Sequence, residues 1–132
     1  MNGNFYGKGR LKEADRLYDR LINLWCKETC APRMRDRWTP DNPTLGQCSI
    51  TAFLVQDILG GDVFGIPLPD GNFHCYNKVG DKVFDLTSEQ FGGEEKSFDY
   101  ESLKYPQSRD VHFRKEEKRL RYEHLKSLLE NS

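Results

Sequence analysis

A cysteine, a histidine and an aspartate stand in this chain where a thiol could carry out acyl chemistry. Cys48 follows Gly46-Gln47 and opens a strongly apolar segment, and His74 and Asp85 come later in the chain. A cysteine is a useful nucleophile only as the thiolate, which a helix N-terminus and a neighbouring imidazolium both favour. A helix that begins at Cys48 would also supply unpaired backbone N–H groups beside the sulfur. The sequence therefore predicts thiol chemistry at Cys48, provided that the fold brings His74 and Asp85 to it.

A β-hairpin is the element expected to bring His74 and Asp85 together. Strand-like stretches cover 73–79 and 82–87, and only Gly80-Asp81 separates them, which suits a type II′ turn. The register set by this turn pairs Val79 with Lys82, Tyr76 with Asp85, and His74 with Thr87. Directly opposed residues share a face, so His74 and Asp85 are predicted to be diagonal neighbours. The opposite face is expected to pack in the core and carries Phe73, Cys75, Val79, Phe84 and Leu86.

Helices are predicted on both sides of this hairpin. Apolar residues recur at helical spacing over 11–26 and again over 115–130, with charged residues between them. Residues 48–59 are apolar on nearly every side and end at Gly60-Gly61, which predicts a central, buried helix. A further strand is expected at 62–66.

The remaining segments are predicted to be irregular. Three prolines break any period over 31–46, the loop that leads to the central helix. The segment 92–107 is polar and contains one weak helical turn, at 100–103. We therefore expect a single α+β domain over 1–132, in which a Cys-bearing central helix packs on a short antiparallel sheet, with helices at the N- and C-terminal ends.

Charge and composition exclude some classes of partner. The chain has 20 basic and 21 acidic residues, so no overall field favours nucleic acid or an anionic membrane. Basic residues over 114–126 alternate with glutamates, which predicts an exposed helix face, and His112 and His124 are expected on the same surface. The first eight residues lack an apolar signal core, and no apolar run is long enough to span a membrane. A cytoplasmic protein with reduced thiols, no membrane partner and no cofactor is expected.

Several short motifs carry a family resemblance. They are Gly46-Gln47-Cys48-Ser-Ile-Thr-Ala, His74-Cys-Tyr-Asn77 and Asp85-Leu-Thr-Ser-Glu-Gln90-Phe91, with Trp38, Asn42-Pro43 and Arg121-Tyr122. With these motifs, roughly the last hundred residues of the chain resemble the small bacterial YunG-like family. The order of a cysteine, a histidine with an aromatic residue two positions on, and Asp-x-Thr is also similar to the transglutaminase-like branch of the papain-like superfamily. That similarity implies a cysteine at the top of a helix, with the histidine and its acidic partner on adjacent strands.

The resemblance also implies roles for the three residues. By position, Cys48 would be the nucleophile, His74 the general base and acid, and Asp85 the group that orients the imidazole. Such a site would transfer the acyl group of a peptide, protein or small amide through a thioester to water or an amine. Peptidase, amidase and transglutaminase activities all fit this description.

Four further residues are candidates for oxyanion or substrate contacts. Papain-like enzymes place an oxyanion-stabilising glutamine several residues before the cysteine, whereas here Gln47 directly precedes Cys48 and Asn42 lies six positions before it. Tyr76 and Gln90 are the other two candidates.

Two alternatives to an enzyme stay open. One is a catalytically silent module that binds a peptide or protein with the same fold. The other is a structural zinc protein that uses Cys26 and Cys30, which stand four apart near the end of the first helix. No second ligand pair has suitable spacing, so no metal site is predicted.

Overall fold

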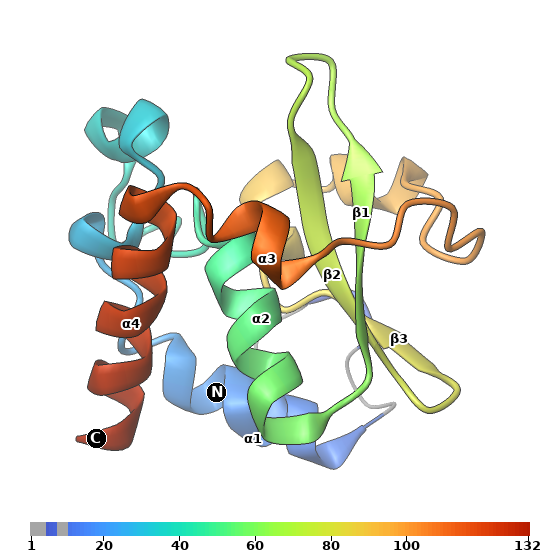
Figure 1. Cartoon of the computed structure of the whole chain (residues 1–132), viewed down its shortest axis with the longest axis horizontal. Coiled ribbons are helices and arrows are strands. Elements are labelled where there is room, and N and C mark those ends of the chain that lie inside the picture. Colours follow the sequence, from blue (N-terminus) through green and yellow to red (C-terminus); the bar gives the residue numbers. More distant parts are fainter. Residues whose placement is uncertain (1–4, 8–10) are drawn as a thin grey trace.

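The structure is a computed structural model that describes residues 5–7 and 11–132; most of the first eight residues lie outside this part. It has an α+β architecture with one antiparallel sheet in the order β1-β2-β3 and helices packed around it (Figure 1). The strands are β1 (Asp62–Pro67), β2 (Phe73–Val79) and β3 (Lys82–Phe84). The α-helices are α1 (Lys12–Leu21), α2 (Cys48–Leu59), α3 (Arg109–His112) and α4 (Glu116–Glu130). Short 3-10 helices are η1 (Lys27–Thr29), η2 (Pro32–Arg37), η3 (Ser88–Phe91) and η4 (Glu94–Ser97).

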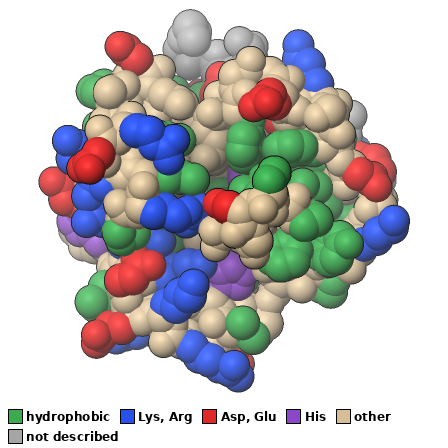
Figure 2. All heavy atoms as spheres, turned by 90° about the horizontal axis from the view of Figure 1, so that it is seen from above, with side chains coloured by type: hydrophobic (Ala, Val, Ile, Leu, Met, Phe, Trp, Pro, Cys, Tyr) green, Lys and Arg blue, Asp and Glu red, His purple; other side chains and the backbone are tan. Residues whose placement is uncertain are grey.

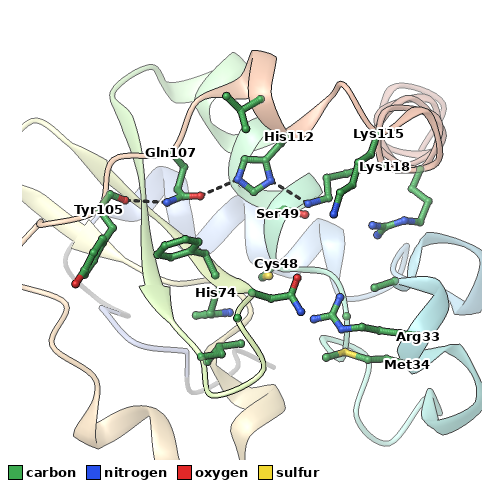
Figure 3. A pocket seen from close by; sticks show the side chains of 18 of the residues that line it. Arg33, Met34, Cys48, Ser49, His74, Tyr105, Gln107, His112, Lys115 and Lys118 are labelled. Carbon is green, nitrogen blue, oxygen red and sulfur yellow. Dashed lines mark hydrogen bonds between the residues drawn. The ribbon is translucent and has the colours of Figure 1, made fainter.

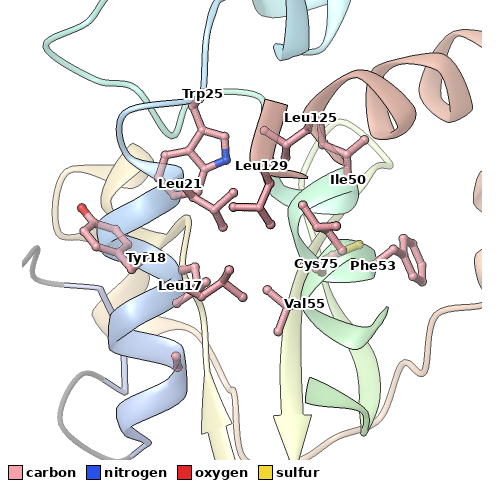
Figure 4. Close-up of a cluster of buried hydrophobic side chains, with 14 of the residues drawn as sticks. Leu17, Tyr18, Leu21, Trp25, Ile50, Phe53, Val55, Cys75, Leu125 and Leu129 are labelled. Atoms are coloured by element: carbon pink, nitrogen blue, oxygen red, sulfur yellow. The ribbon is translucent and has the colours of Figure 1, made fainter. Parts of the chain in front are cut away.

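Helix α2 is the centre of the fold, as the sequence predicts. It begins at Cys48 and ends at Leu59, and Gly60 follows with φ 79°, a left-handed value that suits glycine. The helix lies between the sheet and α4, and α1 closes the same core (Figures 1 and 4). The buried core side chains drawn in Figure 4 include Leu17, Leu21, Trp25, Ile50, Phe53, Val55, Cys75, Leu125 and Leu129. Because α2 is buried on several sides, its first residue has a fixed position at one end of the core.

The hairpin between β2 and β3 has the predicted turn and register at its start. Its pairs are Asn77 with Phe84, Lys78 with Val83, and Val79 with Lys82, and Gly80 has φ 61°. The strand ends at Phe84 rather than at Thr87, because the backbone N–H of Asp85 donates to the carbonyl of Tyr6 at 3.0 Å. The predicted pairs of Tyr76 with Asp85 and of His74 with Thr87 are therefore absent from the described ladder.

Other predicted elements differ from the structure in their bounds. The first helix ends at Leu21 instead of continuing to residue 26, because the chain turns so that Trp25 enters the core and its Nε1 donates to Thr51 Oγ1 at 2.9 Å. Part of the predicted loop 31–46 is the 3-10 helix η2. No helical turn forms at 100–103, where Leu103 has a left-handed φ of 52°, and the turns lie earlier, in η3 and η4.

The two faces of β2 differ in a further respect from the prediction. Cys75, Phe84 and Leu86 are buried in the core, and Val79 packs against it. Phe73, however, is 37% exposed and lies beside Tyr105 with ring centroids 5.5 Å apart. It comes at the first position of the strand and pairs with Pro67, the last residue of β1. In the described residues, no helix is both long and apolar enough to cross a membrane.

Candidate active site

Cys48 lies half-buried at the first position of α2, and the backbone before it makes a tight turn. Gly46 has φ 72°, and a Cβ at this position would lie 2.5 Å from Cys30 Sγ and 2.9 Å from the nitrogen of Ala31. The backbone N–H of Ala31 donates to the carbonyl of Gly46 at 2.9 Å, and the N–H of Gly46 donates to Gln90 Oε1 at 3.3 Å. A glycine is therefore required at position 46 to bring the chain into α2 with Cys48 first.

His74 and Asp85 meet by a direct hydrogen bond. His74 Nε2 and Asp85 Oδ2 are 2.5 Å apart, and both side chains are almost completely buried. The same carboxylate oxygen accepts from the Tyr100 hydroxyl at 2.6 Å. The other oxygen accepts from the backbone N–H of Thr87 at 3.1 Å and from its hydroxyl at 3.3 Å. Four donors thus hold the carboxylate in one orientation, and the carboxylate holds the imidazole.

Aromatic rings enclose the imidazole. The Phe91 ring meets His74 edge to face, with centroids 4.6 Å apart, and the Phe98 ring is 6.0 Å away. Tyr100 packs edge to face on Tyr76 and is 2% exposed. These rings keep bulk water from the bond between His74 and Asp85, which strengthens its electrostatic part.

The charges of Cys48 and His74 depend on each other. Hydrogen bonds from the Cys75 thiol and from the His74 imidazole outweigh burial and hold the pKa of Cys48 well below its ordinary value. Burial favours the neutral imidazole, but Asp85 and the Cys48 sulfur outweigh it and raise the pKa of His74 to about 10. The bond to Cys48 and burial raise the pKa of Cys75 well above its ordinary value, so this thiol acts as a donor. At neutral pH these directions describe a Cys48 thiolate beside a His74 imidazolium.

The two nitrogens of His74 have separate partners. Nε2 is bonded to Asp85, whereas Nδ1 is buried and has no hydrogen-bond partner among the described residues. Nδ1 is thus the nitrogen left to interact with the Cys48 sulfur, an interaction that contributes to the raised pKa of His74. The ring can hold a proton on the side of Cys48 while Asp85 stabilises its positive charge.

A cavity of about 890 Å³ opens onto Cys48 and His74 (Figure 3). Arg33 and Met34 of η2 line one side, and Tyr105 and Gln107 line another. Its wall also includes Lys115, which directly precedes α4, and Lys118 and Arg121 of α4. The sequence predicts this segment only as an exposed helix face. The thiol is therefore reachable from a sizeable pocket whose wall includes several cations.

His112 lies in this pocket and not on the outer surface where it was expected. Its Nε2 is 2.8 Å from Gln107 Oε1, and its Nδ1 is 2.9 Å from Lys118 Nζ (Figure 3). Burial and the positive charge of Lys118 lower the pKa of His112 to about 4, so this ring is neutral at neutral pH. Its sequence neighbours give no sign of this position, because the contacts depend on how α3 and α4 pack over α2.

Only one of the four further candidates reaches the pocket. This candidate is Gln90, which lines the pocket and whose Oε1 also accepts a hydrogen bond from the N–H of Gly46. Gln47 is fully buried, and its Nε2 donates to the carbonyl of Cys26 at 3.0 Å. Asn42 lines a separate cavity of about 730 Å³. The Tyr76 hydroxyl is buried and donates to the carbonyl of Tyr100 at 2.9 Å, so its role here is packing.

The other cysteines differ in surroundings. Cys75 points to the core face, as predicted, but its contact with the Cys48 sulfur was not foreseen. Cys26 Sγ lies 3.7 Å from Thr29 Oγ1, and the Cys30 thiol donates to the carbonyl of Ala31 at 3.5 Å. Within residues 5–7 and 11–132, no group of three or more His, Cys, Asp or Glu side chains is arranged to hold a metal ion.

Comparisons with known proteins place the chain among sequence relatives. It is 38% identical over 65 residues to the uncharacterized protein YunG of Bacillus subtilis (strain 168). This alignment covers 49% of the chain and 56% of that relative, so the match spans about half the length of each. No solved structure matches the chain. The model of the YunG protein family matches residues 13–132, and the chain therefore belongs to the YunG family.

Proposed function

We propose that the protein is a thiol-dependent acyl-transfer enzyme or hydrolase that uses Cys48, His74 and Asp85. The observation that carries the proposal is the buried bond of 2.5 Å between His74 and Asp85 next to a thiol of lowered pKa, at the wall of an open cavity. The Asp85 carboxylate accepts four hydrogen bonds and holds the His74 imidazole beside the Cys48 sulfur, which lines the cavity. A purely structural site has little need for this arrangement. Perturbed groups in a cavity are typical of catalytic sites.

The proposed reaction begins with the Cys48 thiolate and the His74 imidazolium. The Cys48 thiolate attacks the carbonyl carbon of an amide, an S–C bond forms, and the carbonyl electron pair moves to the oxygen. Backbone N–H groups at the start of α2, on Cys48 and Ser49, stabilise this oxyanion, because the first turn of a helix has unpaired donors. This role replaces the one considered for Gln47, whose Nε2 donates to the carbonyl of Cys26, and for Asn42, which lines a separate cavity.

The thioester forms when the C–N bond breaks. The electron pair of the oxyanion returns to the carbonyl, and the imidazolium of His74 gives its Nδ1 proton to the leaving amine. Water, or a second amine, then loses a proton to His74 and attacks the thioester carbonyl. The C–S bond breaks, and the thiolate and imidazolium are restored. Throughout the cycle Asp85 keeps Nε2 protonated and stabilises the imidazolium.

Peptides, proteins and small amides are the proposed substrates, with water or an amine as the acceptor. The proposal agrees with the transglutaminase-like and papain-like resemblance of the motifs around Cys48, His74 and Asp85. It rests on the site geometry rather than on that resemblance. A silent module with the same site would form the thioester but fail to release it.

An activated ester tests the proposal without knowledge of the natural substrate. With p-nitrophenyl acetate, the parent protein should release nitrophenolate in a burst of one equivalent, followed by steady turnover, and mass mapping should find the acetyl group on Cys48. Cys48→Ser should lose both phases. Cys26→Ser is the matched control, because this half-buried thiol lies outside the pocket wall, and it should behave like the parent. A burst without turnover would favour the silent module, and no acetyl group on Cys48 would refute the proposal.

A further inference from the structure

We infer that the substrate of this site carries an anionic group, in the simplest case a carboxylate, which Lys115, the residue before α4, and Lys118 in its first turn bind beside Cys48. The inference rests on the proposed function, since it specifies what the same thiol attacks. It concerns the side of the cavity formed by α4, which Figure 3 shows next to Cys48.

The charges around the cavity are strongly unequal. The whole chain has a net charge of −1, yet the described residues that line the cavity include several cations and a single carboxylate, Glu117. The cations are Arg33, Lys104, Lys115, Lys118 and Arg121. Glu117 is bonded to Arg121 Nε at 2.8 Å, so these two charges offset each other. The excess of positive charge inside a concave wall would attract and concentrate an anion.

Three of the described lysines that line the cavity, Lys104, Lys115 and Lys118, have no acidic partner, and the last two lie at the start of α4. Arg33 lies 3.9 Å from Asp70, but in the described part of the chain Lys115 and Lys118 are within salt-bridge distance of no carboxylate. Both project from the start of α4 toward the cavity (Figure 3). Two like charges at one wall repel each other and destabilise the fold slightly, unless a ligand of opposite charge binds there.

Lys118 is also held in place. Because the neutral ring of His112 donates from Nε2 to Gln107 Oε1, its Nδ1 accepts from the Lys118 ammonium at 2.9 Å. Gln107 Nε2 in turn donates to the carbonyl of Tyr105 at 3.1 Å. These hydrogen bonds fix the position of the ammonium and bring no carboxylate to it, since His112, Gln107 and the carbonyl of Tyr105 are neutral. A preorganised cation of this kind binds an anion with little loss of side-chain entropy.

An apolar rim faces the cations. Phe73, Tyr105 and Val111 line the cavity and are 37%, 44% and 54% exposed. Seen from above, the largest patch of hydrophobic side chains lies on the right of the molecule, and many of the Lys and Arg side chains lie beside it, toward the left and bottom of the view (Figure 2). A cavity with both properties fits an amide that has an apolar part and a carboxylate, with the reacting carbonyl over Cys48 between them.

Two alkylating reagents of nearly equal size measure this preference. Iodoacetamide is neutral and iodoacetate is an anion, and in each reaction the thiolate displaces iodide to form a thioether. We take the ratio of the iodoacetate rate to the iodoacetamide rate at Cys48, relative to the same ratio for 2-mercaptoethanol. The thiolate fraction cancels in this ratio. We expect it to exceed the reference roughly tenfold at low salt and to fall toward it at about 1 M salt, where the screening length is only about 3 Å.

Lysine variants in and next to α4 show which side chains cause the preference for iodoacetate. Lys118→Gln and Lys115→Gln should each lower the ratio severalfold, and Lys115 is exposed, so its replacement leaves the core intact. Lys126→Gln is the matched control, because it removes the same charge from an exposed position two turns further along the helix, and it should leave the ratio unchanged. A ratio at the reference value, or one equally sensitive to Lys126→Gln, would overturn the inference while leaving the proposed function standing. If Cys48 reacts slowly with both reagents near neutral pH, the proposed function itself fails.

Discussion

Asp85→Asn should abolish the thiolate at Cys48 at neutral pH while preserving the shape of the side chain. The carboxylate accepts four hydrogen bonds, from His74, from Tyr100 and two from Thr87. An amide oriented to accept from His74 would turn its NH₂ against the backbone N–H of Thr87, where donor meets donor. In the opposite orientation the NH₂ donates to His74 Nε2, and the ring proton must sit on Nδ1, facing the sulfur. Either way the ring loses the carboxylate that stabilises its positive charge.

The expected size of the effect follows from the pKa of His74. Asp85 and Cys48 raise this pKa to about 10 against the effect of burial, so without the carboxylate burial favours a neutral ring. Cys48 then keeps only the hydrogen bond from Cys75, which burial opposes, so its pKa rises toward that of an ordinary thiol. At a pKa near 8.5 only roughly 0.3% of a thiol is thiolate at about pH 6. The greater nucleophilicity of a more basic thiolate recovers part of this loss. Alkylation of Cys48 at about pH 6 should therefore be at least about tenfold slower than in the parent.

Iodoacetamide labelling over a pH series, followed by peptide mass mapping, measures this effect. The parent profile of Cys48 should be nearly flat through neutral pH, whereas that of Asp85→Asn should rise about tenfold per pH unit up to about pH 8. Cys26 serves as an internal reference, and circular dichroism checks the fold. Asp81→Asn is the matched control, since this aspartate lies in the hairpin turn with its side chain 90% exposed. Superimposable profiles for the parent and Asp85→Asn would refute the reasoning and leave Asp85 with a packing role.

Three further outcomes are expected. Gly46→Ala should lower the free energy of unfolding in urea by more than about 1 kcal/mol, because its Cβ would meet Cys30 Sγ at 2.5 Å; an unchanged midpoint would contradict the tight turn. Tyr100→Phe should cost about 1.5 to 3 kcal/mol by the same measurement, through the loss of one donor to the buried Asp85 carboxylate. The pKa of His112 is lowered to about 4, so its contribution to stability should be lost as the pH falls from about 6.5 to about 4, where only the unfolded state gains a proton. His112→Gln should reduce this acid sensitivity, and an equal loss of stability in both proteins would count against it.

Local patterns were sufficient to predict α2 and the start of the hairpin. A long apolar run that ends at Gly60-Gly61 indicates a buried helix from Cys48, and Gly80-Asp81 fixes the first pairs of β2 with β3. These features depend on neighbouring residues alone. The meeting of His74 with Asp85 was also predicted, but from pairs further along the hairpin that do not form, because Asp85 leaves the strand and bridges to Tyr6.

Contacts between distant segments set the rest of the site. Tyr100 reaches Asp85 from an irregular segment with a left-handed residue at Leu103, which no periodicity predicts. His112 enters the cavity because the short helix α3 packs beside α2, where its ring lies 5.2 Å from that of Phe53. Cys75 touches the sulfur of Cys48 across the interface between β2 and α2. Tertiary packing decides each of these positions, so one sequence without its fold could not supply them.

Direct titration of the Cys48 thiolate tests the central claim. The far-ultraviolet absorbance of thiolate, taken as the difference between the parent and Cys48→Ser over a pH series, counts the charge on this one sulfur. Because hydrogen bonds from Cys75 and His74 hold the pKa of Cys48 well below its ordinary value, one full thiolate should be present at about pH 7. The same absorbance difference is then taken between the His74→Ala variant and the double variant that also carries Cys48→Ser. This difference should show thiolate only at alkaline pH. A parent difference that stays at zero until about pH 8 would contradict the account, because Cys48 would then be an ordinary thiol.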